Sequence, residues 1–428
     1  FKICRNHEMK KNYFLLFIIL FWILSLLLST IWGYSNPEKI EILKSFYEKN
    51  KKPDLEIIQS NVKKIIANSF YVELSQIISL SEKTAFIVYE DNNSGFDENK
   101  LQIYTQNGYL IKNLKPEKLK LPGVFTMQRN GGVKTIFIYK NNKFALISSS
   151  KINCFYASIV SLKNGNELFK TKCLPEDKKN TDFNGLGSSN VHHNNYIYLS
   201  VGAPEQSSSK ISALAQDINS KFGKILVINK KNLDIINIDQ ENGLDLKIFT
   251  MGHRNPQGLT KIDDSIFSVE HGPLGGDELN KIIKNKNYGW PAVSYGTKYL
   301  YDEKGKSYDI DHQSKGYEEP LFALTPSVGI SALNRCPLKL RNFYKKPCLI
   351  ALSLMGNNLR PGKSIIIFLL NKQMNKVHSV EQIFLGEEYR FRHFVTDSNN
   401  SLYEDENGSI YVSADQKGIY KIDFLNFR

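Results

Sequence analysis

The chain has 428 residues, of which 41% are hydrophobic and 12% aromatic, and its formal net charge at pH 7 is +13. This composition is sufficient for a large packed core and argues against a disordered chain. The charge comes mostly from lysines scattered along the sequence, without the sustained basic block that is typical of a nucleic-acid-binding tail. We therefore expect no nucleic-acid partner. A generally basic surface favours anionic ligands or membranes only weakly.

The N-terminal region predicts a membrane anchor. Residues 13–34 form an uncharged run of 22 residues, YFLLFIILFWILSLLLSTIWGY, which as a helix is long enough to cross about 30 Å of hydrocarbon. Lys10 and Lys11 precede this run, so residues 1–12 are expected in the cytoplasm and the remainder on the periplasmic side of the inner membrane. A cleaved signal peptide, which would release a secreted protein, is the alternative.

Four cysteines follow the predicted anchor, and export places them in a compartment where disulfides persist. They form two close pairs in the sequence, which favours Cys154 with Cys173 and Cys336 with Cys348. Four cysteines nevertheless allow three connectivities. Neither pair has the spacing of a metal site.

Residues 35–75 are charged and mixed in character, and predict a stalk with a helix at 38–50. Residues 76–428 instead repeat a short unit, in which a turn precedes alternating β-branched and aromatic residues. The six units, roughly 50 to 85 residues apart, are KTAFIVY (83–89), NKFALIS (142–148), NYIYLSV (195–201), DSIFSVE (264–270), PCLIALS (347–353) and GSIYVSA (408–414). This spacing suits one four-stranded sheet per unit, so the region predicts an all-β, six-bladed β-propeller. A β-sandwich with long loops is the alternative.

The segment EHGPLGGDELN, residues 270–280, has the chemistry of a binding loop. Its glycines allow close approach of a ligand to the main chain, and Pro273 fixes the backbone so that the carbonyls of Gly272 and Pro273 can face outward. Carbonyl oxygens suit a hard cation such as Ca²⁺, and Asp277 and Glu278 add carboxylates nearby. Two other unusual segments flank this loop in the sequence: GHRNPQGL (252–259) and NYGWP (287–291).

These three segments, in this order, resemble the soluble dehydrogenases of the glucose/sorbosone dehydrogenase family, which use pyrroloquinoline quinone (PQQ). The family is a six-bladed propeller, in agreement with the repeat count. Weaker matches at 215–229, 325–333 and 390–392 extend the resemblance over roughly residues 130–424. It implies PQQ- and Ca²⁺-dependent oxidation of a sugar hydroxyl, with electrons passed to a respiratory acceptor.

The resemblance also implies roles for individual residues. PQQ carries three carboxyl groups, for which guanidinium groups are natural partners. The carbonyls of Gly272 and Pro273 match positions that bind Ca²⁺, which would act as a Lewis acid. The side chains that match cofactor positions are Arg254, Asn255, His271, Asp277, Ser327, Arg390 and Arg392.

Two positions depart from the family pattern. The histidine that takes the proton of the sugar hydroxyl is matched by Asn184, and an amide is not a base. Asp182 is a second candidate for that role, whereas His192 and His193 are expected on the surface. A cofactor-binding lysine of the family is matched by Met355. The alternative function is therefore a catalytically impaired propeller that binds a sugar, a glycan or a protein; a calcium-dependent hydrolase would not need the three arginines.

Overall fold

The computed structural model describes residues 37–58, 62–90, 95–175, 181–204, 209–236, 241–298, 307–356 and 362–427. The chain divides into two compact units, Phe1–Asn50 and Lys51–Arg428. In the first unit the described residues form the helix α2 (Pro37–Asn50), which confirms the helix expected at 38–50. The expected cytoplasmic segment and membrane anchor lie outside the described residues. Of the helices that are described, none is long and apolar enough to span a membrane.

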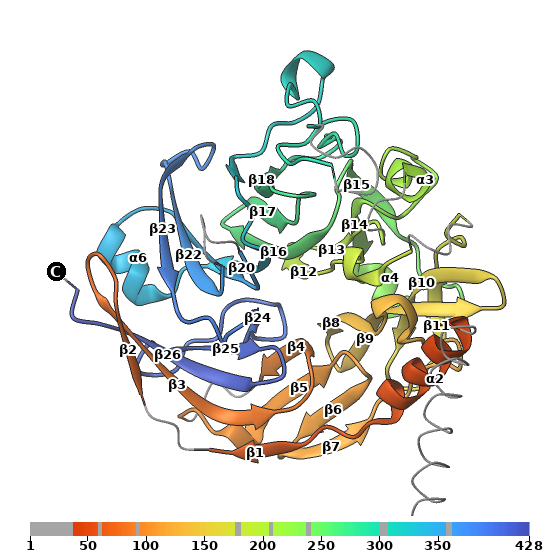
Figure 1. The fold of residues 1–428 in the computed structure, drawn as a ribbon, viewed down its shortest axis with the longest axis horizontal. Helices are drawn as coiled ribbons and strands as arrows, with labels where there is room; N and C mark the ends of the chain where they lie inside the picture. The colour runs from red at the N-terminus through yellow and green to blue at the C-terminus, as the bar shows by residue number, and fades with distance from the viewer. Residues whose placement is uncertain are drawn as a thin grey trace, which may run out of the picture. The chain divides into compact units, whose positions relative to one another are not determined.

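The second unit consists of six antiparallel sheets arranged in a ring, and the innermost strands of neighbouring sheets lie against one another (Figure 1). We number the sheets one to six along the chain. From the innermost strand outward they are: sheet one, β4 (Thr84–Tyr89), β5 (Leu101–Thr105), β6 (Tyr109–Lys112) and β7 (Lys115–Lys118); sheet two, β8 (Val133–Tyr139), β9 (Asn142–Lys151), β10 (Cys154–Ser161) and β11 (Glu167–Lys170); sheet three, β12 (Asn190–His193), β13 (Tyr196–Val201), β14 (Lys224–Asn229) and β15 (Lys247–Met251); sheet four, β16 (Pro256–Ile262), β17 (Ser265–Glu270), β18 (Asp277–Ile282) and β19 (Phe322–Leu324); sheet five, β20 (Ile330–Arg335), β21 (Cys348–Ser353), β22 (Ser364–Leu370) and β23 (Val377–Phe384); sheet six, β24 (Phe391–Phe394), β25 (Ile410–Ala414), β26 (Gly418–Leu425) and β3 (Tyr71–Leu80), with β1 (Leu55–Ile57) and β2 (Lys63–Ile66) both paired to β3.

Short helices occupy the connections between these strands. They are α3 (Ser209–Ser212), α4 (Lys230–Ile235) and α6 (Leu338–Tyr344), with the 3₁₀ turns η1 (Glu98–Lys100), η2 (Gln128–Asn130), η3 (Phe183–Gly185), η4 (Ala213–Ala215) and η5 (Gln313–Lys315).

The sequence repeat and the sheets agree. Each of the six repeated segments falls in a different sheet: five form the second strands β9, β13, β17, β21 and β25, and the first forms the innermost strand β4. The six-bladed propeller is therefore confirmed.

Sheet six joins the two ends of the second unit. β3 pairs with β26 in antiparallel register, with Leu74 opposite Ile422. The structure thus differs from the expected stalk at 35–75, because β1, β2 and the start of β3 belong to this sheet. The reason is the alternation along β3, in which Val72, Leu74 and other apolar side chains are buried in the core shared with β25 and β26.

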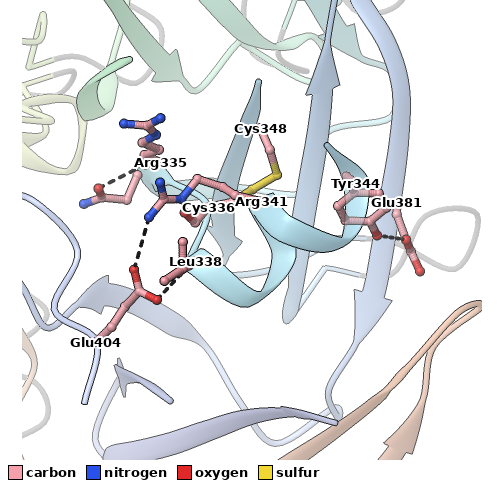
Figure 2. The surroundings of a disulfide bond; sticks show 9 residues. Arg335, Cys336, Leu338, Arg341, Tyr344, Cys348, Glu381 and Glu404 are labelled. Atoms are coloured by element: carbon pink, nitrogen blue, oxygen red, sulfur yellow. Dashed lines mark hydrogen bonds and ion pairs between the residues drawn. A yellow bond between two sulfur atoms is a disulfide. The ribbon is translucent and has the colours of Figure 1, made fainter. Parts of the chain in front are cut away.

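Both expected disulfides are present. Cys154 is bonded to Cys173 and Cys336 to Cys348, with Cα–Cα distances of 5.2 and 5.4 Å. The second bond closes a short loop that contains α6 (Figure 2), where Arg341 Nε donates to the carbonyl of Cys336 at 3.0 Å. The cysteine pairing predicted from the sequence is therefore confirmed.

The pairing of β3 with β26 predicts a large cost for truncating its buried contacts. Ile422 is 0% exposed, so Ile422→Ala should lower the free energy of unfolding by about 2 to 5 kcal/mol, as for other buried Ile or Leu side chains. Ile152 lies in a turn and is 94% exposed, so Ile152→Ala should change the free energy of unfolding by about 0.5 kcal/mol or less. Urea unfolding measures both. Equal effects of the two substitutions would show that the closing sheet is not part of the cooperative core.

Candidate functional site

The three motif segments meet at the end of the ring where the innermost strand β16 begins. We call this end the site face. The loop from β15 to β16 carries the first motif, and the loop from β17 to β18 carries the second. They lie side by side because β16 pairs with β17, with Pro256 opposite Glu270, and because the backbone N–H of His271 donates to the carbonyl of Asn255 at 3.0 Å.

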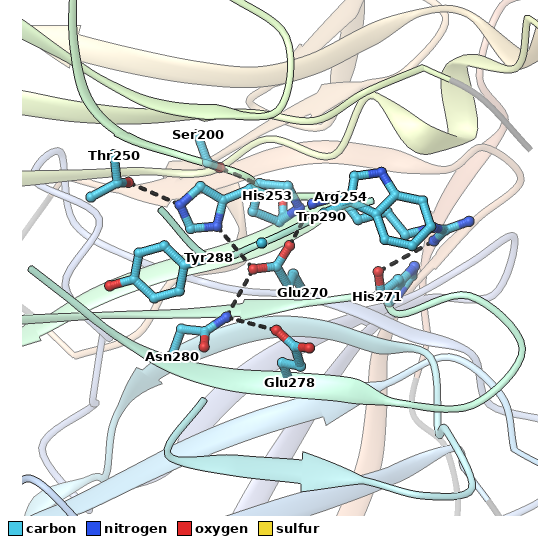
Figure 3. Close-up of polar contacts among 12 residues, drawn as sticks. Ser200, Thr250, His253, Arg254, Glu270, His271, Glu278, Asn280, Tyr288 and Trp290 are labelled. Atoms are coloured by element: carbon cyan, nitrogen blue, oxygen red, sulfur yellow. Dashed lines mark hydrogen bonds and ion pairs between the residues drawn. The ribbon is translucent and has the colours of Figure 1, made fainter. Parts of the chain in front are cut away.

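Glu270, at the end of β17, holds the first motif in place (Figure 3). Its Oε1 atom accepts from Asn280 Nδ2 at 2.8 Å and lies 2.9 Å from His253 Nδ1. Its Oε2 atom accepts from the backbone N–H of Arg254 at 2.8 Å. His253 is fully buried, and its other ring nitrogen lies 2.9 Å from Thr250 Oγ1. His253 is therefore a structural residue that fixes the backbone from which Arg254 projects.

A second carboxyl lies beneath this network. Asn280 Nδ2 also donates to Glu278 Oε2 at 3.2 Å. Burial raises the pKa of Glu278 well above its usual range, and the charge of nearby Glu270 raises it further. The raised pKa favours the protonated form of Glu278, and Glu270 is the carboxyl that contacts both His253 and the Arg254 backbone.

The third motif covers the first. The ring of Tyr288 stacks on His253 with a centroid distance of 4.5 Å, and Trp290 lies over the Arg254 guanidinium, 5.2 Å from Cζ to the ring (Figure 3). Arg254 is nearly buried, and its Nη1 atom donates to the carbonyls of Gly272 at 2.7 Å and His271 at 3.2 Å. The sequence motifs thus form one packed unit around this guanidinium.

Asn255 joins the loop of Asn184 to the second motif. Its Oδ1 atom accepts from the backbone N–H of Gly187 at 2.8 Å, and its Nδ2 atom donates to the carbonyl of Asn184 at 3.2 Å. Nδ2 also lies 3.3 Å from His271 Nδ1. The side chain of Asn184 is exposed on η3. The structure therefore brings Asn184, Asn255 and His271 together.

Asp277 and Asp182 have structural contacts. Asp277 is buried; its Oδ1 accepts from the backbone N–H of Gly272 at 3.2 Å, and its Oδ2 accepts from those of Val328 and Ile330, each at 3.1 Å. It thereby fixes the loop that carries Ser327. Asp182 caps η3, since its Oδ1 accepts from the Asn184 backbone N–H at 2.8 Å. Neither carboxylate is directed at a ligand by these contacts.

The two late arginines share one carboxylate. Arg392 forms a two-point ion pair with Asp415 through Nε and Nη2, and Arg390 Nε lies 3.6 Å from the same group. Burial alone would raise the pKa of Asp415, but the charge and hydrogen bonds of Arg392 outweigh it and lower the pKa. Two cations facing one anion leave a net positive charge on this side of the site face.

His271 lies between the arginine groups. Burial lowers its pKa, the charges of Arg254 and Arg392 lower it further, and Asp277 opposes the change. A neutral imidazole therefore faces positive groups from sheets four and six. Two of the three arginines that the sequence assigned to a cofactor, Arg254 and Arg392, thus lie close enough to His271 to act on it.

The expected surface position of two histidines is only partly correct. His192 is 5% exposed, and burial lowers its pKa to about 4; His193 is half-buried. Both lie at the end of β12 that leads into the hairpin with β13, whereas Asn184 precedes the start of that strand. His192 is buried because β12 is the innermost strand of its sheet. Met355 is 53% exposed and places an uncharged side chain beside the Ser327 loop.

Sequence reasoning missed Glu270 and Trp290 as organising residues. Glu270 is the only charged residue of β17 and directly precedes His271, so a carboxylate at the buried end of that strand was the available signal. It also missed Lys134, which is the second residue of the innermost strand of sheet two and belongs to no motif.

Fold and site together define a six-bladed β-propeller with a cationic site built on the loops of one face. The sequence profile of the Glucose / Sorbosone dehydrogenase family matches residues 139–418. The chain belongs to the glucose/sorbosone dehydrogenase family, as the sequence motifs indicated.

Individual relatives are more distant. An aldose sugar dehydrogenase of Escherichia coli (strain K12) is 30% identical over 146 residues, 32% of this chain and 36% of that protein. Quinoprotein glucose dehydrogenase B of Acinetobacter calcoaceticus is 38% identical over 94 residues, 22% of this chain and 19% of that protein. The aligned region thus spans little more than a third of the first of these curated relatives and less of the second.

Solved structures of dehydrogenases share the fold. The apo form of the soluble aldose sugar dehydrogenase from Escherichia coli has a TM-score of 0.59 at 20% identity, over 87% of this chain and 99% of that one. The PQQ-bound aldose sugar dehydrogenase from Streptomyces coelicolor has a TM-score of 0.51 at 15% identity, over 87% and 98%.

The ion pair between Arg392 and Asp415 predicts a pH-dependent stability. Because the folded pKa of Asp415 lies below its ordinary value of 3.8, the stabilisation is fully present above that value and is lost as the pH falls through the lower folded pKa. Asp415→Asn should therefore destabilise the protein more at pH 6 than at pH 3, as measured by urea unfolding. Asp264→Asn is the control, since that side chain is 95% exposed. If Asp415→Asn lowers the free energy of unfolding by the same amount at both pH values, the stabilising role of the ion pair is contradicted.

Proposed function

We propose that this protein is a PQQ- and calcium-dependent dehydrogenase that oxidises a sugar hydroxyl. The observation that carries the proposal is the position of Arg254 and Arg392 near His271, with Arg390 beside the Asp415 carboxylate that pairs with Arg392. PQQ is a planar tricarboxylate, and guanidinium groups are its natural partners.

Buried polar atoms that have no hydrogen-bond partner support the proposal that PQQ binds at the site face. Among the described residues, the buried Nε1 of Trp290 and Oγ of Ser327 have no hydrogen-bond partner, and buried polar atoms of this kind usually mark a missing ligand or water. Trp290 lies against Arg254 and Ser327 beside the Asp277 loop, so both atoms belong to the site face. Arg254 would hold a carboxylate, and Ser327 and Trp290 would donate to carbonyl or carboxylate oxygens.

The calcium part of the proposal rests on carbonyl oxygens. The carbonyls of Gly272 and Pro273 suit a hard cation, and no cluster of three or more His, Cys, Asp or Glu side chains with the geometry of a metal site occurs in the described part of the chain. The Gly272 carbonyl accepts from Arg254, so calcium would compete with the guanidinium for this atom. When bound, PQQ would supply the hydride acceptor and calcium would polarise it as a Lewis acid.

We further propose that the site works on the periplasmic side of the inner membrane, held there by residues 13–34, and passes electrons to a respiratory acceptor. The two disulfides support an oxidising compartment. Membrane fractionation of the native protein, before and after an alkaline wash, tests the anchor. Recovery in the soluble cytoplasmic fraction would contradict it.

The second candidate function is a propeller that binds a sugar or glycan without oxidising it. It is favoured by Asn184, whose exposed amide lies where the family resemblance expects a base. Absorption spectra of the protein reconstituted with PQQ and Ca²⁺, recorded before and after adding aldoses, distinguish the two functions. Reduction of the quinone by an aldose supports the dehydrogenase. Sugar binding without reduction supports the binding protein.

The arginine cluster predicts a specific loss of cofactor affinity. Arg254→Ala should weaken PQQ binding by about 2 to 4 kcal/mol, because it removes one partner of a charge-assisted contact from a nearly buried position. Isothermal calorimetry with Ca²⁺ present measures the change. Arg335→Ala, an exposed position at the far end of β20, is the matched control and should leave the affinity unchanged. If the wild-type protein binds no PQQ, the proposed function is wrong.

A further inference from the structure

Lys134 occupies a β-bulge at the site face. Between Val133 and Thr135 the pairing of β8 with β9 shifts register, so that Lys134 has no partner on the neighbouring strand. The same shift occurs at Gln257, the second residue of β16, and the amide of Gln257 donates to Asn255 Oδ1 at 2.8 Å. A bulge re-aims the side chain of its extra residue. Lys134 therefore holds the position in sheet two that in sheet four supplies a contact to the site.

A short chain of hydrogen bonds links Lys134 to the Asn184 turn. Lys134 Nζ donates to the carbonyl of Asn130 at 2.9 Å. Asn130 Nδ2 donates to Asp182 Oδ1 at 3.0 Å, and the same oxygen accepts from the backbone N–H of Asn184. The amine of Lys134, on β8, is thus bonded to η2, and η2 is bonded to the Asp182 cap of η3, the turn that carries Asn184.

The charges around the amine leave it poorly compensated. Asp182 on the cap of η3 favours its protonation, while Arg392 on β24 and Lys83 before β4 oppose it. No ion pair joins Lys134 to a carboxylate of the described chain within 4.0 Å. Burial is the largest effect and, with the two cations, lowers the pKa of Lys134 to about 7. The lowered pKa favours the neutral amine, the form that a proton acceptor requires.

We propose that Lys134 is the general base that takes the proton of the sugar hydroxyl, in place of a histidine at position 184. This inference rests on the proposed dehydrogenase function. The O–H proton passes to Nζ and yields an ammonium group, the C–H hydrogen leaves with its electron pair for an oxidised quinone, and the hydroxyl-bearing carbon becomes a carbonyl carbon. The electron count balances because the quinone takes the two electrons that the sugar loses.

The other candidates are less suitable. The Asn184 amide is not a base, but its exposed side chain can orient the hydroxyl beside Lys134. Asp182 uses one oxygen to cap η3 and to bind Asn130. His192 lies at the opposite end of β12 and is buried.

The first test needs no cofactor. Competitive labelling of the protein with a trace of an amine-reactive electrophile, followed by mass spectrometry at each pH from 5 to 11, gives the titration curve of each lysine. The reference compound is Nα-acetyl-lysine amide, whose ε-amine is free and fully exposed to solvent. The proposal expects Lys134 to reach half of its maximal reactivity near pH 7. A curve that superimposes on the reference amine would overturn it.

The second test is kinetic and uses PQQ-loaded protein with Ca²⁺ and the aldose that reduces it. In the wild type kcat/KM should rise with pH through a midpoint near 7 as Lys134 loses its proton. Lys134→Met should lower kcat/KM by roughly a hundred- to ten-thousand-fold and abolish that rise, the range expected for loss of a general base. Lys134→Arg keeps the charge but cannot lose its proton, and should behave like the methionine variant.

Two further variants separate catalysis from structure. Lys143→Met removes another half-buried lysine, whose Nζ donates to Gln102 Oε1, and should leave kcat/KM unchanged. Adding Asn184→His to the Lys134→Met variant should raise kcat/KM at least ten-fold above that of Lys134→Met alone, because it returns a base to the neighbouring turn. PQQ affinity should stay within three-fold of wild type in the Lys134 variants that fold.

The outcomes separate the two hypotheses. A wild-type protein that binds no PQQ refutes the dehydrogenase function, and this inference with it. A protein that binds PQQ and oxidises sugars, but keeps its rate and pH profile in Lys134→Met, refutes this inference alone. Loss of PQQ binding in both Lys134 variants would show that the lysine anchors the cofactor, which also contradicts its role as the base.

Discussion

The site exists only because the ring of sheets is closed. Its residues come from sheets two to six, and in an open chain these segments would be separated by up to about 260 residues of sequence, from position 134 to 392. The antiparallel pairing of β3 with β26 brings the first strands of the second unit against the last. This pairing fixes the distance between Arg392 on β24 and the groups that face it across β4. A weakness far from the site, on the outer strands of sheet six, would therefore also affect the site.

Within the closed ring, buried carboxylates set the local geometry. Glu270 fixes the backbone of Arg254, and Asp277 fixes the loop of Ser327 through two backbone N–H groups. Each carboxylate accepts several hydrogen bonds, which is how a buried charge is tolerated in a protein interior. The groups proposed to face a ligand thus rest on a layer of acidic residues that do not.

Much of this arrangement could be predicted from the sequence. The repeat of turn and alternating strand gave the number of sheets, and the local spacing of the cysteines gave their pairing. The motif segments indicated Arg254, Asn255 and His271, and these residues lie together. Asp277 was predicted next to the cofactor, and the sequence did not show that its buried carboxylate accepts from the backbone N–H groups of Gly272, Val328 and Ile330. The strands at 55–80 were missed since their partner, β26, lies more than 300 residues away in the sequence. Lys134 was missed because a bulge is a property of strand pairing and leaves no mark in a single strand.

The bulges at the start of the innermost strands have a consequence for how such a protein can change. A register shift at the same place occurs in sheets one, two, four and five, at Ala85, Lys134, Gln257 and Ser331, and a wider one in sheet six spans Arg392. These positions lie at the start of the innermost strands, where the side chain of an extra residue is re-aimed by the bulge. A chemical group lost from one sheet can be supplied by a single substitution in another, without moving the main chain. A propeller of this kind can therefore exchange its reactive groups between sheets while its architecture stays the same.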